Sequence, residues 1–144
     1  MKFKVEALCI SVKKGVQKKE VAEVRLIENF GIEGDSHAGR SHRQVSFLAG
    51  EAVDKIRQEG LELKPGAFSE NIVTRGIDWT KAKIGGIIHI GQTELEITQI
   101  GIECQNPCAI YYTVGYCIMI TMGIFARVKK GGIIHAGSSG YYHL

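Results

Sequence analysis

The strongest nucleophile that this chain offers is the thiol of Cys108, which ends the run Gly101-Ile-Glu-Cys-Gln-Asn-Pro-Cys. A thiolate is a soft nucleophile and a soft metal ligand, so it suits chemistry on sulfur or molybdenum. Pro107 restricts its own φ and biases Asn106 toward an extended conformation, so few backbone conformations lead to Cys108. We therefore interpret Cys108 as a candidate reactive thiol. The alternative is a small buried cysteine that packs and does not react.

Two further cysteines, Cys104 and Cys117, flank Cys108 in the sequence. They could act as auxiliary thiols that resolve an oxidised or persulfidated Cys108. The three cysteines could instead form a structural zinc site, but their Cys-x3-Cys-x8-Cys spacing has no close fourth ligand. We therefore predict no resident metal.

A second group of polar residues lies in the run Gly31-Ile-Glu-Gly-Asp-Ser-His-Ala-Gly-Arg40, which leads into Arg43. Glycines allow backbone N–H groups to approach an anion closely, and an arginine can bind an anion with two parallel hydrogen bonds. Asp35 and His37 could also bind a metal, although two ligands make a weak site. The alternative is an ordinary turn in which Asp35 and Ser36 bind their own backbone.

A lysine-rich segment separates two alternating runs, Phe3 to Val12 and Val21 to Phe30, and has Gly15 near its centre. We interpret it as a solvated hairpin loop, with docking of an anionic ligand or partner as the alternative. The lysines are Lys13, Lys14, Lys18 and Lys19.

The remaining pattern predicts a mainly β fold, a barrel or a sandwich, with one prominent α-helix and short peripheral helices. Glycines separate short β-branched segments, which favours strands over a helical bundle. Apolar residues at helical spacing, followed by Gly60, predict the helix at about 49–59. Strands are expected near 43–48, 69–74, 86–90, 93–100, 124–129 and 132–136.

A short echo supports the strand assignment, because the run 85–91 recurs almost unchanged at 131–137. Each copy reads as a strand between glycine turns, and two copies are too few for a repeat architecture. We interpret His89 and His135, one in each copy, as exposed or half-buried strand residues and not as ligands.

Composition limits the classes of protein that the chain can belong to. Four cysteines in 144 residues are too few for a disulfide scaffold, and no signal-peptide pattern opens the chain. The longest apolar runs are too short to span a bilayer, and a net charge of +3 does not by itself indicate nucleic-acid binding. We expect a single cytoplasmic domain over residues 1–144 with reduced thiols, and no membrane or nucleic-acid partner.

Taken in order, the motifs of this chain resemble the MOSC domain, which ends eukaryotic molybdenum cofactor sulfurases and also occurs as small free-standing bacterial proteins. The resemblance covers nearly the whole chain. The matching pieces are Gly31-Ile-Glu-Gly-Asp-Ser-His37, Arg43-Gln-Val-Ser46, Pro65-Gly-Ala-Phe-Ser-Glu70-Asn71-Ile, the Cys104 to Cys108 segment, and Gly123-Ile-Phe-Ala-Arg127-Val followed by Gly131-Gly132.

This resemblance implies a β-barrel whose characteristic cysteine, here Cys108, carries sulfur for metal-sulfur centres and acts on a molybdopterin-type cofactor. Because a lower thiol pKa adds thiolate but reduces its nucleophilicity, we assign the nearby polar and charged residues to binding an anionic cofactor or persulfide. These residues are Asp35, His37, Arg43 and Arg127. The alternative is a pterin-phosphate binding module in which Cys108 ligates molybdenum without turnover.

The resemblance also suggests partners and supporting residues. The chain lacks the pyridoxal phosphate half of the full sulfurases, so we expect a separate sulfur donor such as a cysteine desulfurase. The acceptor would be a molybdoenzyme or a cofactor-biosynthesis protein. Glu70 and Asn71 match the Phe-x-Glu-Asn signature, and we expect them to be internal supports, because a buried carboxylate must be paired or hydrogen-bonded.

Two departures from the family pattern bear on substrate docking. Ser138 follows Gly137 where the family usually has an aspartate, so a carboxylate is missing. The stretch Met119-Ile-Thr-Met122 replaces a charged turn before Gly123.

Overall fold

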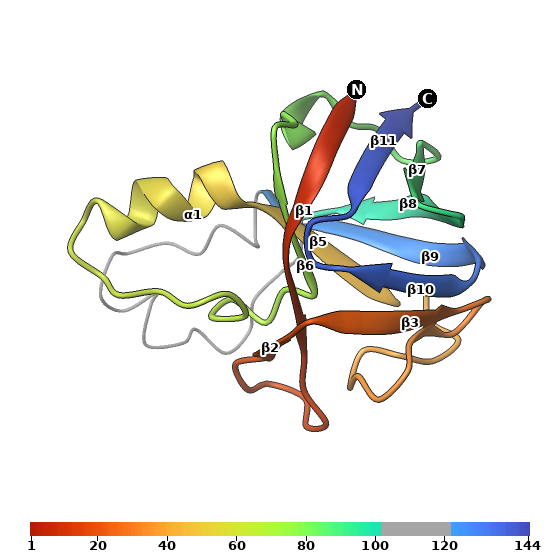
Figure 1. Cartoon of the computed structure of the whole chain (residues 1–144), viewed down its shortest axis with the longest axis horizontal. Coiled ribbons are helices and arrows are strands. Elements are labelled where there is room, and N and C mark those ends of the chain that lie inside the picture. Colours follow the sequence, from red (N-terminus) through yellow and green to blue (C-terminus); the bar gives the residue numbers. More distant parts are fainter. Residues whose placement is uncertain (102–121) are drawn as a thin grey trace.

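The computed structural model describes residues 1–101 and 122–144, and Figure 1 shows their arrangement. Strands are the main secondary structure of the described chain, which also has one α-helix and one short 3-10 helix. In chain order the elements are β1 (Lys2–Ile10), β2 (Lys19–Val21), β3 (Glu23–Ile27), β4 (Gly31–Ile32), β5 (Val45–Ala49), α1 (Gly50–Arg57), β6 (Ile72–Arg75), η1 (Trp79–Lys81), β7 (Ile87–Ile90), β8 (Thr93–Ile100), β9 (Ile124–Lys130), β10 (Gly132–His135) and β11 (Ser139–His143).

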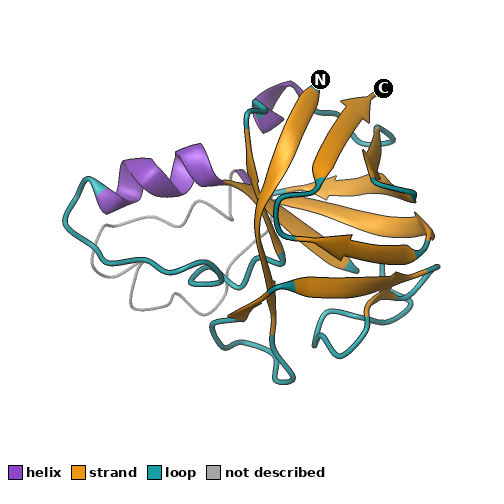
Figure 2. Cartoon of the chain, in the orientation of Figure 1, coloured by secondary structure: helices purple, strands orange, loops and turns teal. Residues whose placement is uncertain are grey.

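The main sheet closes into a barrel. Its strands follow the order β11-β7-β8-β9-β5-β6-β1-β2, and a further pairing between β1 and β11 joins the two sides. Neighbouring strands are antiparallel except β5 and β6, which are parallel. A parallel pair needs a crossover connection, and α1 forms part of it, projecting from the barrel in Figure 2. A smaller sheet, β10-β3-β4, lies beside β9.

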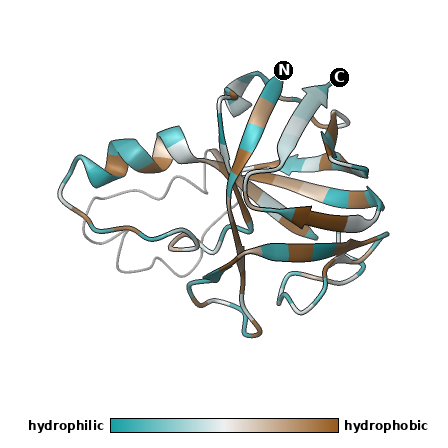
Figure 3. Cartoon of the chain, in the orientation of Figure 1, coloured by the Kyte–Doolittle hydropathy of each residue, from teal (hydrophilic) through white to brown (hydrophobic). Residues whose placement is uncertain are grey.

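Buried and exposed residues alternate along the strands, so that the apolar side chains fill the barrel. In β8, Leu95 and Ile97 are buried while Glu94 and Glu96 lie on the outer face. The same alternation of hydrophobic and hydrophilic residues is visible along β1 in Figure 3. An aromatic cluster closes one end of the core, where the ring of Trp79 lies 5.6–6.0 Å from the rings of Phe3, Phe47 and Tyr142.

The structure confirms the predicted β-barrel with one prominent helix. The helix expected at 49–59 is α1, and each of the six expected strands is present, as β5 to β10. The two echoing runs are β7 and β10, with His89 half-buried and His135 exposed. Strands β2, β4 and β11 were not predicted, because they are short or rich in polar residues and form by pairing with neighbours. None of the helices in the described ranges is long and apolar enough to cross a lipid bilayer.

The pairing that closes the barrel depends on a glycine. Gly140 of β11 lies opposite Phe3 of β1, and a Cβ atom at this position would lie 2.1 Å from the Phe3 ring. The phenyl ring therefore occupies the space that a side chain would need.

We predict that Gly140→Ala destabilises the protein by about 1–3 kcal/mol, because the added methyl group forces Phe3 out of its packed position. The free energy of unfolding from denaturant titration measures this. Ser139→Ala, one residue earlier on the exposed face, should change stability by no more than about 0.5 kcal/mol. Equal stability of Gly140→Ala and the wild type would contradict this prediction, because it would mean that the Phe3 ring can move aside at no cost.

Candidate functional site

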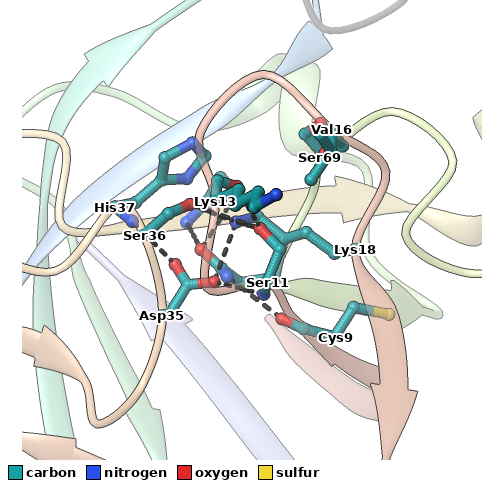
Figure 4. Close-up of polar contacts among 11 residues, drawn as sticks. Cys9, Ser11, Lys13, Val16, Lys18, Asp35, Ser36, His37 and Ser69 are labelled. Carbon is teal, nitrogen blue, oxygen red and sulfur yellow. Dashed lines mark hydrogen bonds and ion pairs between the residues drawn. The ribbon is translucent and has the colours of Figure 1, made fainter.

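A buried ion pair lies at the end of the barrel where β1 ends. Lys18 directly precedes β2 and Asp35 follows β4, and Lys18 Nζ lies 2.8 Å from Asp35 Oδ1. The two side chains are only 1% and 0% exposed. Figure 4 shows both residues among the polar side chains that surround them. The pair therefore joins two loops that are 17 residues apart in the sequence.

Hydrogen bonds satisfy the remaining polar atoms of this pair. Lys18 Nζ also donates to Ser11 Oγ at 3.1 Å and to Ser36 Oγ at 3.3 Å. Asp35 accepts hydrogen bonds from the backbone N–H groups of Ser11 and His37 at 3.0 and 3.1 Å. The backbone N–H of Ser36 donates to the Ser11 carbonyl at 2.7 Å. These contacts fasten the loop after β4 to the end of β1.

The pKa of Asp35 lies below its usual value. Burial alone would raise this pKa, but the Lys18 ammonium and the hydrogen bonds from Ser11 and His37 outweigh that effect. The carboxylate is therefore ionised at neutral pH. Its stabilising contribution is complete above the ordinary aspartate pKa and is lost as the pH falls through the lowered value.

His37 follows in the same loop, half-buried, with an unpaired ring nitrogen. Its Nδ1 is buried and has no hydrogen-bond partner. Burial lowers the pKa of His37, Lys18 and Arg43 lower it further, and Asp35 and Asn71 act in the opposite direction. Because the net pKa is below the ordinary value, the imidazole is neutral at pH 7 and can accept a proton or a hydrogen bond.

Asn71 joins three parts of the barrel wall. Its Oδ1 accepts hydrogen bonds from the backbone N–H and the hydroxyl of Ser46, and its Nδ2 donates to the Cys9 carbonyl at 3.1 Å. The backbone N–H of Cys9 in turn donates to the Asn71 carbonyl at 2.7 Å. The side chain thus ties the start of β6 to both β1 and β5.

Glu70 holds the turn that precedes Asn71. Its carboxylate accepts hydrogen bonds from the backbone N–H groups of Gly66 at 3.1 Å and Phe68 at 3.0 Å. Burial raises the pKa of Glu70 and these hydrogen bonds oppose the rise. Gly66 has a φ of +91° and lies against the Lys18 backbone, where a Cβ atom would meet the Lys18 carbonyl oxygen at 2.1 Å. The Glu70 turn therefore packs directly on the chain that carries the buried lysine.

The polar loop also contacts the chain that leads to the cysteines. His42 Nε2 lies 2.7 Å from Gln99 Oε1, and Gln99 Nε2 donates to the Gly101 carbonyl at 2.7 Å. The Gly101 N–H donates to the Gly123 carbonyl at 2.8 Å, so the end of β8 lies beside the start of β9. The segment with Cys104, Cys108 and Cys117 begins directly after Gly101, and these three residues lie outside the described part of the chain.

Cys9 is the cysteine that the structure describes. It is fully buried, and burial together with Glu70 and Glu20 raises the pKa of its thiol to about 12. Such a thiol is almost entirely protonated at neutral pH and does not act as a nucleophile.

The two predicted anion-binding arginines occupy different surroundings. Arg43 is exposed, close enough to His37 to affect its pKa, and its guanidinium makes no ion pair with the described residues. Arg127 pairs with Glu96 across β8 and β9 at 2.8 Å. No hydrogen bond in the described ranges links Arg127 to Asp35, His37 or Arg43. The structure thus brings Asp35, His37 and Arg43 together and leaves Arg127 with Glu96.

The structure corrects the prediction of a solvated loop at one position. Lys13, Lys14 and Lys19 are exposed as expected, but Lys18 is buried against Asp35. Lys18 and Ser11 were not predicted as members of the site, because nothing in the sequence distinguishes a buried lysine within a run of lysines. The one available signal was Asp35, since a carboxylate beside a buried strand needs a cationic or N–H partner.

The residues at this site fit an anionic ligand better than a metal ion. No group of three or more histidine, cysteine, aspartate or glutamate side chains in the described ranges could hold a metal ion. The exposed Arg43 guanidinium makes no ion pair with the described residues, so it offers a cation to such a ligand. A guanidinium of this kind suits a phosphate or another small anion.

We predict that Lys18→Met destabilises the protein by about 3–5 kcal/mol, because it leaves the Asp35 carboxylate buried without its cation. The same change should raise the pKa of His37, since it removes a positive charge that lowers it. Denaturant titration measures the first effect and NMR titration of the imidazole the second. Lys13→Met, which removes an exposed charge, is the control. An unchanged His37 pKa in Lys18→Met would contradict the electrostatic coupling.

We predict that Glu70→Ala lowers the free energy of unfolding by about 2–6 kcal/mol, because two buried N–H groups lose their acceptor. Glu62→Ala, in the exposed chain after α1, should have little effect and serves as the control. A Glu70→Ala protein of normal stability that cannot carry sulfur would instead make Glu70 catalytic.

Comparisons with known proteins agree with this architecture. The crystal structure of the YUAD protein from Bacillus subtilis matches with a TM-score of 0.83 at 22% identity, covering 99% of this chain and 96% of that one. YiiM from Geobacillus stearothermophilus matches with a TM-score of 0.71 at 18% identity, covering 99% and 75%. YiiM from Escherichia coli matches with a TM-score of 0.64 at 20% identity, covering 100% and 70%.

Among curated protein sequences, none matches this chain. The structural likenesses show the fold alone, since each is below 25% identity. The profile of the MOSC domain, however, matches residues 34–139, which is more than half of the chain and includes Asp35, His37, Glu70 and Asn71. The chain therefore belongs to the MOSC domain family.

Proposed function

We propose that this protein is a sulfur carrier of molybdenum cofactor metabolism that works through a persulfide on Cys108. MOSC domains are linked to functions related to the molybdenum cofactor, and that link supports this cofactor as the substrate class. The observation that carries the proposal is the contact chain from His42 through Gln99 to Gly101, three residues before Cys104. It ties the polar loop of the site to the start of the cysteine segment.

The loading step is an exchange between sulfur atoms. The Cys108 thiolate attacks the terminal sulfur of a persulfide on the donor protein, a new S–S bond forms at Cys108, and the donor thiolate leaves. Electrons balance without an external oxidant, because one S–S bond replaces another. Cys9 cannot take this role, since its thiol is buried and its pKa is about 12.

The release step uses a second thiol. The thiolate of Cys104 or Cys117 attacks the Cys108 sulfur, which forms a disulfide and frees hydrosulfide for the molybdenum centre of the substrate. A cellular dithiol then reduces the disulfide, so that the thiols can load again.

The described residues hold and orient the anionic groups in these steps. Arg43 is an unpaired cation that attracts the persulfide or the cofactor phosphate. The neutral His37 ring can take the proton that the Cys108 thiol loses before its thiolate attacks. The Lys18–Asp35 pair fixes the loop that carries His37, since Asp35 binds the His37 N–H.

We predict that Cys108→Ser abolishes persulfide loading, whereas Cys9→Ser leaves it intact. Cys104→Ser and Cys117→Ser should load normally but release sulfur more slowly. Incubation with a cysteine desulfurase and cysteine, followed by mass spectrometry, detects the added sulfur of about 32 Da as a mass that a reductant removes.

Equal loading of Cys108→Ser and the wild type would remove the carrier role from that residue. A wild-type protein that binds a pterin phosphate but never gains a labile sulfur would favour the binding module, in which the cysteine ligates molybdenum without turnover.

A further inference from the structure

The loop between β1 and β2 exposes both cations and apolar side chains. Val12 is 88% exposed and Val16 is 44% exposed. Three exposed lysines stand among and directly after them, namely Lys13, Lys14 and Lys19. The loop projects from the end of the barrel opposite the two labelled termini (Figure 1).

The base of this loop is firmly anchored although its tip is exposed. Lys18 is held by Asp35, and the Ser69 hydroxyl donates to the Val16 carbonyl at 2.7 Å. The Ser11 hydroxyl donates to the Lys13 carbonyl at 3.0 Å (Figure 4). The loop therefore has a defined conformation before it binds a partner, so less conformational entropy is lost on binding.

The charges of the loop are not neutralised within the described structure. Lys13, Lys14 and Lys19 form no ion pair there. The neighbouring loop, fastened by the Ser36 to Ser11 hydrogen bond, adds two exposed arginines without ion pairs, Arg40 and Arg43. The exposed carboxylates in the same two segments are Glu20 and Glu33, so the five cations outnumber them and form a basic rim beside the candidate site.

We propose that this rim, together with the exposed Val12 and Val16, is the docking surface for an acidic face of the protein that supplies sulfur to Cys108. The inference rests on the proposed function. Apolar residues surrounded by charged ones are the usual composition of a protein interface, and neither valine would contact a small anion usefully. Complementary charge on the donor raises the rate of encounter and orients the two proteins.

Two observations favour a protein partner over a nucleic acid. The chain has a net charge of only +3, and the cations of the rim occupy two loops and do not form an extended stripe. Nucleic-acid affinity arises mostly from many simultaneous phosphate contacts. The exposed Val12 and Val16 contribute nothing to phosphate contacts, whereas they can be buried against a protein surface.

The test compares Lys13→Glu/Lys14→Glu with a matched control, Lys81→Glu/Lys83→Glu, which changes the net charge equally. The control lysines are exposed and lie in and just after η1, close to the chain termini and far from the loop (Figure 1). Sulfur transfer to each protein is measured by mass spectrometry with two donors, a cysteine desulfurase supplied with cysteine, and inorganic polysulfide. Each is measured at about 50 mM and about 500 mM salt, which screen charges over very different distances.

Transfer from the desulfurase at low salt should fall about tenfold or more in Lys13→Glu/Lys14→Glu, and the difference should shrink at high salt. Polysulfide loading at high salt should match the wild type, which shows that the thiol site is intact. Val12→Ser should slow transfer from the desulfurase in a way that salt does not alter.

Other outcomes overturn the proposal in recognisable ways. Equal rates of transfer from the desulfurase to both double variants and to the wild type would exclude docking at this loop. Docking would also be excluded if polysulfide loads the wild type and the desulfurase does not. Loss of polysulfide loading would mean that the loop shapes the thiol site itself. If the wild type and the control variant bind a labelled single-stranded DNA and Lys13→Glu/Lys14→Glu does not, the rim would be a nucleic-acid surface. If polysulfide fails to load the wild type, the carrier function itself fails.

Discussion

The buried pair of Lys18 and Asp35 is the constraint on which this end of the barrel depends. Removing two charges from water costs several kcal/mol for each, and the pair is tolerable only because hydrogen bonds satisfy its other polar atoms. Ser11, Ser36 and the His37 N–H provide those bonds. The requirement leaves little freedom to either loop, because moving one would leave a charge buried without its partners. A costly interaction thereby fixes the position of the functional loop.

The second set of buried polar groups reinforces the first. Glu70 shapes the turn that contains Gly66, and Gly66 packs on the Lys18 backbone with no room for a side chain. The next residue, Asn71, ties that turn to β1 and β5. The two networks therefore meet at Lys18, whose partner Asp35 lies in the loop that carries His37. This explains why a signature of neighbouring residues, Phe68 to Asn71, can matter for a site to which it contributes no reactive group.

Sequence alone predicted the features that arise from local pattern. Strand β8 was placed correctly because its alternation is regular, and α1 because its apolar spacing is helical. The hydrogen bonds expected for a buried Glu70 are present. Strand β11 escaped prediction because it is held by pairing with β1 and β7, and its residues have little apolar character. The burial of Lys18 was not predicted for the same reason, since its partner Asp35 is distant in the sequence.

The electrostatics of the barrel separate two environments for a thiol. Near Cys9, burial and the carboxylates of Glu70 and Glu20 raise the pKa to about 12, so only about one thiol in 10⁵ is ionised at pH 7. The loops that carry Lys13, Arg40 and Arg43 have more exposed cations than exposed carboxylates. Positive charge lowers the pKa of a thiol, so an exposed thiol near these loops would ionise more readily than Cys9. The contacts from His42 to Gly101 start the cysteine segment on that basic side, so the same charges that would attract an acidic donor would also stabilise the sulfur anion that it delivers.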